Sequence, residues 1–172
     1  MSHFAGHSLG RQLALQFLFS LEFIQTPWRQ ALEEFWHMDP VKLTRTSFDR
    51  DEMPAVLQYK CGKSHLLDAR LHAEGLIVGV CECAEELDAA IVAILDNWKP
   101  ERVGRIEWVI MRLAFYEMRA CPETPVPVVM SEAIRLANIF CDKDAARFVN
   151  GLLERLREAL ERGEDAGHDA QA

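Results

Sequence analysis

Residues 105–160 decide the fold class, and they read RIEWVIMRLAFYEMRACPETPVPVVMSEAIRLANIFCDKDAARFVNGLLERLREAL. Three helical patterns follow one another here, separated by a proline-rich bend and by a turn at residues 142–144. The first pattern, Ile106 to Ala120, is apolar nearly all round, which is typical of a central helix with neighbours on several sides. Because an arginine inside such a helix needs its donors filled, we interpret Arg112 as a structural ion pair or a clamp on carbonyl groups.

The two patterns that follow are amphipathic. The second has the apolar stripe Ala133, Ile134, Ala137 and Phe140, and the third has Phe148, Val149, Leu152, Leu153, Leu156 and Leu160. Thr124 suits an N-cap and Pro125 a first helical position, so the middle helix is expected to begin there, with Pro127 in its first turn. Gly151 lies in mid-helix, where glycine costs about 1 kcal/mol against alanine, and we interpret it as a site of close helix packing.

Four further helical patterns precede this stretch. The first is expected to start at Ser8, a good N-cap residue, and its apolar stripe continues as far as Ile24. The other three patterns cover residues 28–37, 64–84 and 87–98. No alternation typical of β-strands occurs, so the sequence predicts an all-α bundle of about seven helices.

Two segments lack helical periodicity. Residues 41–62 are rich in polar residues, and we interpret them as a long loop or insertion. Residues 163–172 have no apolar residue larger than alanine and are predicted to form a disordered tail. We therefore predict a single helical domain over residues 1–162, with residues 41–62 as a loop or insertion within it.

Composition narrows the class of protein. The chain has 172 residues, enough for one domain with a real core, and a net charge of −8. Because nucleic-acid binders usually have a basic field, any contact with nucleic acid must come from a local patch. No apolar run approaches the roughly 20 residues that cross a bilayer, and no secretory signal is evident, so we expect a cytoplasmic protein without membrane contact.

The sequence contains no pattern typical of an active site or a metal site. Its five cysteines are scattered and odd in number, so we interpret them as free thiols. Its six histidines have no HExxH spacing, and no GxSxG, Walker or GxGxxG pattern occurs. We therefore predict that the protein holds no metal or cofactor, whereas an active site of another kind stays open at this point.

Five motifs in order carry a resemblance to a known family. They are Gly10-Arg-Gln-Leu-Ala-Leu-Gln-Phe-Leu-Phe19, Glu74-Gly-Leu-Ile-Val-Gly-Val80, Arg112-x-Ala-x-Tyr-Glu117, Ser131-Glu-Ala-Ile-x-Leu-Ala137 and Phe148-Val-Asn-Gly-Leu-Leu153. Together they resemble the NusB family of bacterial transcription antitermination factors. The resemblance implies an all-α fold of two small helical subdomains and a role without catalysis. It also implies pairing with the ribosomal protein NusE, binding of boxA RNA, and action on transcription elongation complexes at ribosomal RNA operons.

The resemblance further implies which residues bind. Arg11 matches the last residue of the family's arginine-rich, RNA-binding segment. Because His7, Ser8 and Leu9 precede it here, fewer phosphate contacts form, which predicts weaker and less salt-dependent RNA binding. The start of the last helix is expected to contact RNA through three residues, namely Asp144, Arg147 and Phe148. Phe148 also begins an apolar stripe, so core packing and base stacking both stay open for its ring.

Contacts with NusE are implied at Phe19 and Glu107. Two alternatives remain beside this reading. One is a NusB-like domain related to those of RNA cytosine methyltransferases, although these 172 residues show no Gly-rich βαβ pattern that would hold S-adenosylmethionine. The other is a relative that acts mainly through protein contacts with weakened RNA affinity. The sequence leaves open whether the protein is a monomer or a homodimer.

Overall fold

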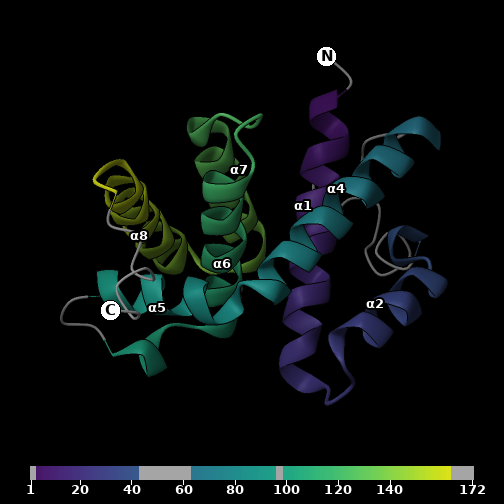
Figure 1. Ribbon diagram of the computed structural model, residues 1–172, viewed down its shortest axis with the longest axis horizontal. Helices are drawn as coiled ribbons and strands as arrows, with labels where there is room; N and C mark the ends of the chain where they lie inside the picture. The colour runs from purple at the N-terminus through teal and green to yellow at the C-terminus, as the bar shows by residue number, and fades with distance from the viewer. Residues whose placement is uncertain (1–2, 43–62, 96–98, 164–172) are drawn as a thin grey trace, which may run out of the picture. The chain divides into compact units, whose positions relative to one another are not determined.

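The computed structural model describes residues 3–42, 63–95 and 99–163, and every regular element in these ranges is helical (Figure 1). The elements are α1 (His3–Ser20), η1 (Leu21–Phe23), α2 (Trp28–His37), α4 (Lys63–Glu82), α5 (Ala84–Ile94), η2 (Pro100–Arg102), α6 (Arg105–Ala120), α7 (Val126–Phe140) and α8 (Lys143–Glu161). The predicted all-α fold is confirmed, and the seven α-helices bounded within these ranges agree with the predicted number.

The ends of the helices test the sequence predictions closely. Helix α2 has the predicted bounds, and α6 begins one residue before the predicted Ile106 and ends at Ala120 as predicted. The predicted start of the first helix at Ser8 is wrong, because α1 already begins at His3. Helix α5 ends at Ile94 and not at residue 98. Ile24, counted in the first helical stripe, is extended and 42% exposed.

The two segments predicted to be irregular lie mostly outside the described residues. Residues 40–42 are helical, so the loop prediction is wrong at Val41 and Lys42, where Asp39 Oδ1 accepts a hydrogen bond from Lys42 N at 3.3 Å. Residues 43–62 and residues 164–172 lie outside the described ranges. Gly163 follows α8 with a φ of 69°, a left-handed conformation that commonly ends a helix.

The chain divides into two compact units, Met1–Ile77 and Val78–Ala172. They correspond in number to the two small subdomains that the resemblance implies. In the first unit α1 crosses α4 closely, because a Cβ at Gly10 would lie 2.8 Å from the carbonyl oxygen of Ala69 (Figure 1). Packing at this crossing reaches Gly6, where a Cβ would lie 3.3 Å from Asp68 Cβ. Packing of Gly6 against α4 therefore explains why α1 begins before Ser8.

Helix α6 is the centre of the second unit and packs against α5, α7 and α8 (Figure 1). Most of its residues between Val109 and Met118 are buried, as expected for a helix that is apolar nearly all round. Glu117 is only 1% exposed. The prediction that this helix is central is confirmed.

Arg112 is a structural ion pair, as predicted. Its Nε and Nη2 donate to the two carboxylate oxygens of Asp88 on α5, at 2.6 and 2.7 Å. Trp108 Nε1 donates to the same carboxylate at 2.7 Å. A two-pronged pair of this kind is strong and directional, so Asp88 holds α5 and α6 in register.

Three glycines have different surroundings. Gly79 on α4 lies against the ring of Tyr116, and an added Cβ would overlap the ring atoms, so α4 and α6 approach each other closely there. A Cβ at Gly75 or Gly151 would meet no atom within 4 Å. The interpretation of Gly151 as a packing site is therefore wrong. It lies on the exposed side of α8, opposite the buried stripe that includes Val149 and Leu153.

The ends of α7 and α8 are formed in different ways. Helix α7 begins at Val126 with Pro125 at the N-cap, so the predicted cap at Thr124 is wrong, whereas Pro127 lies in the first turn as predicted. Thr124 is buried and its N–H donates to Cys121 O at 3.0 Å, which places it in the preceding turn.

Candidate functional site

The start of α8 presents charged side chains to solvent. Asp142 is the N-cap, and its Oδ1 accepts hydrogen bonds from Asp144 N at 3.0 Å and Ala145 N at 2.8 Å. Such a cap satisfies N–H groups that the helix itself leaves without partners. It also occupies the donors that an anion would otherwise find at this helix end.

Arg147 and Asp144 lie one turn apart on this exposed surface. Arg147 Nη1 is 3.7 Å from Asp144 Oδ1, and their side chains are 83% and 93% exposed. An exposed pair of this kind contributes about 0–1 kcal/mol to stability. Arg147 can therefore leave Asp144 for a negatively charged ligand with little loss of stability.

Phe148 follows directly and is half-buried, between the exposed Arg147 and the buried Val149. This position fits both interpretations of its ring, core packing and base stacking. Asn150 and Gly151 are exposed beyond it. The exposed side chains between Asp144 and Gly151 are thus polar, namely those of Asp144, Arg147 and Asn150. Gly151 ends this surface and has no side chain.

Glu107 lies in the first turn of α6, where its carboxylate folds over the N-cap residue Gly104. It also accepts a hydrogen bond from the thiol of Cys141, the first residue after α7. Burial, the charges of Glu107 and Asp142, and this hydrogen bond together raise the pKa of Cys141 to about 12. The start of α6 therefore lies beside the start of α8, so Glu107, the implied NusE contact, is near the helix end that is expected to contact RNA.

Phe19 lies in the other unit, near the end of α1. It is half-buried, and its ring meets that of Phe23 edge-on, with centroids 5.1 Å apart. Phe23 is 63% exposed and Ile24 is 42% exposed. These three residues form an apolar patch, of which sequence reasoning found only Phe19, because Ile24 was expected to continue a helical core stripe.

Arg11 differs most from its expected environment. It is 3% exposed, although the helical pattern places it off the apolar stripe. Burial, followed by the charge of His7 and then that of Arg11, lowers the pKa of His72, and the rings of His7 and His72 stack at a centroid distance of 4.1 Å. RNA contact by Arg11 stays a prediction, but in this conformation the guanidinium offers little surface to a phosphate.

Neither a metal cluster nor a membrane helix is found in the ranges that the structure describes. There, no group of three or more His, Cys, Asp or Glu side chains could hold a metal ion. In the same ranges, no helix is both long and apolar enough to cross a bilayer.

Comparison with known proteins identifies the family. The family model described as NusB matches residues 9–158. The chain belongs to the NusB family. A transcription antitermination protein NusB of Desulfovibrio desulfuricans is 32% identical over 154 residues, which cover 90% of this chain and 85% of the relative. The NusB of Bacillus subtilis is 43% identical over 88 residues, covering 51% of this chain and 67% of the relative.

Solved structures agree with this assignment. The NusB of T. maritima is 25% identical, with a TM-score of 0.64, and the match covers 88% of this chain and 90% of that one. A chain in the crystal structure of a plectonemic RNA supercoil has the same fold, with a TM-score of 0.68 at 20% identity over 94% of this chain and 98% of its own. The relatives are named as antitermination proteins, which are non-catalytic, so this NusB-family chain is not an enzyme.

Proposed function

We propose that this NusB-family antitermination factor pairs with the ribosomal protein NusE and that the pair binds boxA-type RNA. It would act in the cytoplasm on elongation complexes, notably at ribosomal RNA operons. The family match over residues 9–158 carries the proposal. The exposed and weakly paired Arg147 at the start of α8 gives it a surface.

Arg147 is the strongest candidate for a phosphate contact. Its partner Asp144 lies 3.7 Å away and is 93% exposed, so a phosphate oxygen can replace that carboxylate with little loss of stability. A charge-assisted bond to phosphate is about twice as strong as a neutral one. Phe148, next in sequence and half-buried, would supply a ring for an unpaired base.

Contacts with NusE are proposed at Phe19 in the first unit and at Glu107 in the second. The patch of Phe19, Phe23 and Ile24 is apolar and partly exposed, and aromatic anchors of this kind dominate many protein interfaces. Charge reversal by Glu107→Lys should weaken the NusE complex. Because Glu107 also accepts a bond from Cys141, the variant Cys141→Ala is the control that reports loss of the internal contact alone.

The test is a titration of labelled boxA RNA with this protein, with NusE, and with both, at about 50 mM and about 200 mM salt. The pair should bind more tightly than either protein alone. Arg147→Gln should weaken binding and reduce the salt slope by about 0.7, the value for one phosphate contact on a single strand. Arg157→Gln is the matched control on α8, because Glu154 and Glu161 hold that guanidinium at 2.9 and 2.6 Å.

Two results would count against the proposal. Equal losses from Arg147→Gln and Arg157→Gln would remove Arg147 from the RNA surface. Absence of a complex with NusE at micromolar concentrations would reject the partner.

A second candidate function is a protein-binding relative with weakened RNA affinity. Arg11 is 3% exposed and the net charge is −8, so less basic surface is available to RNA. This candidate predicts a NusE complex but weak RNA binding with a shallow salt slope. Sub-micromolar binding with a steep slope in the same titration would reject it.

A further inference from the structure

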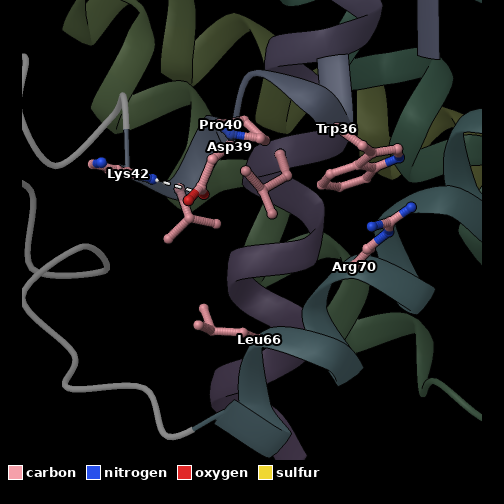
Figure 2. A pocket seen from close by; sticks show the side chains of 8 residues that line it. Trp36, Asp39, Pro40, Lys42, Leu66 and Arg70 are labelled. Atoms are coloured by element: carbon pink, nitrogen blue, oxygen red, sulfur yellow. Dashed lines mark hydrogen bonds between the residues drawn. The ribbon is translucent and has the colours of Figure 1, made fainter. Parts of the chain in front are cut away.

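A cavity of about 540 Å³ lies in the first unit, between α1, α2, α4 and the residues that follow α2 (Figure 2). Its volume is within the range of roughly 300–1,000 Å³ that is common for small-ligand sites. Leu13, Pro40, Val41 and Leu66 give it apolar walls, and Trp36 adds an aromatic side. None of these residues belongs to the surfaces proposed for RNA or NusE.

Most polar groups that line this cavity are hydrogen-bond donors, and they come from Trp36, Arg70 and Lys42. Arg70 lies beside Trp36, with its guanidinium carbon 4.9 Å from the ring centroid (Figure 2). Arg70 Nε donates to Glu74 at 2.9 Å, whereas its two terminal nitrogens have no hydrogen-bond partner among the described residues. Trp36 Nε1 is buried and likewise has no partner in the part of the chain described.

The opposite side of the cavity adds a second cation. Lys42 lies at the rim, and its ammonium makes no ion pair with any residue that the structure describes (Figure 2). The single carboxylate, Asp39, already accepts a hydrogen bond from Lys42 N. In a chain with a net charge of −8, this cavity therefore has two cations against one anion.

The buried Nε1 of Trp36 has no acceptor in the part of the chain described, and the Arg70 side chain, which is 51% exposed, brings a cation to the open side of the same apolar walls. Apolar walls with a few convergent polar groups are typical of a small-ligand site, and the cation favours an anionic ligand. We propose that the cavity binds a small organic carboxylate with an aromatic or branched apolar body. The carboxylate would accept from the terminal nitrogens of Arg70, and the body would pack against Trp36, Leu13 and Leu66. This site goes beyond the proposed function and does not depend on it.

The test uses the full chain and 4-phenylbutyrate as the probe, followed by the NMR signals of the four tryptophan indoles. Trp36→Phe assigns the relevant signal. We expect a saturable shift of the Trp36 signal with a Kd of about 1 mM or tighter, as suits a ligand of this size. The uncharged analogue 4-phenylbutan-1-ol should bind about tenfold more weakly, because it lacks a charge-assisted bond.

Two arginines provide a matched pair of variants. Arg70→Gln should weaken 4-phenylbutyrate about tenfold. Arg29→Gln should leave it unchanged, because Arg29 lies over Trp28, 4.2 Å from that ring, and does not line the cavity. Leu66→Trp, which fills the cavity and keeps Arg70, should abolish binding.

The proposal is overturned if the Trp36 signal shows no saturable shift. Equal affinities for the alcohol and the carboxylate, or equal effects of the two arginine variants, would overturn the anionic part of the assignment.

Discussion

Gly79 and Gly75 lie one turn apart on α4, and replacing each with alanine separates helix propensity from packing. Both substitutions remove the same backbone freedom from the unfolded chain and add the same favourable propensity, about 0.5–1 kcal/mol in each case. They differ in what the new methyl group meets. At Gly75 it meets nothing within 4 Å, whereas at Gly79 it overlaps the ring of Tyr116.

The expected magnitudes follow from this contrast. Gly75→Ala should raise the free energy of unfolding by about 0.5–1 kcal/mol. Gly79→Ala must displace the Tyr116 ring, and overpacking of this kind costs typically about 1–3 kcal/mol. After the propensity gain, the net effect at Gly79 should lie between about zero and about 2.5 kcal/mol of destabilisation, with a difference of about 1–3 kcal/mol between the two variants.

Urea unfolding of both variants and of the parent protein measures this difference, and thermal unfolding should place the two variants several degrees apart. A third measurement isolates the contact. In a Tyr116→Ala background, Gly79→Ala should stabilise about as much as Gly75→Ala does, because the overlapping ring is gone. If Gly79→Ala stabilises the protein that retains Tyr116 as much as Gly75→Ala does, the close approach of α4 and α6 is refuted.

Three further substitutions test other contacts. Asp88→Ala should destabilise by about 2–3 kcal/mol, because Arg112, whose side chain is only 22% exposed, loses its two bonds to Asp88; adding Arg112→Met should recover part of this loss in thermal unfolding. Burial, with the nearby positive charges, lowers the pKa of His72 from 6.5 to about 3, so below pH 6.5 the unfolded chain takes up a proton that the folded chain does not. Stability should therefore fall towards acid by up to about 1.4 kcal/mol per pH unit from this group, and in His72→Gln that part of the slope should be absent from denaturation curves between about pH 6.5 and 4. The raised pKa of Cys141 keeps it a thiol, so iodoacetamide should modify it slowly at alkaline pH; Glu107→Gln removes a neighbouring charge and should speed the reaction by roughly tenfold for each unit that the pKa falls, whereas an unchanged rate would contradict the contact.

Local patterns in the sequence were sufficient for the helices themselves. The bounds of α2, and those of α6 to within one residue, follow from apolar spacing and from Pro27, because both signals act over a few residues. The ionic role of Arg112 could also be predicted, since a cation in an apolar helix needs an anion. Its partner Asp88, 24 residues earlier, could not be named.

Local signals failed where another helix supplies the deciding contact. Ser8 is a good cap by itself, but packing of Gly6 against α4 extends α1 to His3. The stripe of α1 predicts an outward-facing Arg11, yet the folded chain buries it.

The sequence by itself determined the all-α class, most of the helices and the NusB family, because periodicity and motif order are properties of neighbouring residues. Only the tertiary structure decided which glycines are packing sites, that Glu107 lies beside Cys141, and that Trp36 and Arg70 flank a cavity. Each of these depends on atoms from helices far apart in the chain. Residues 105–160 thus specify their helices, whereas the surface around Glu107 and Arg147 exists only once α6, α7 and α8 have packed together.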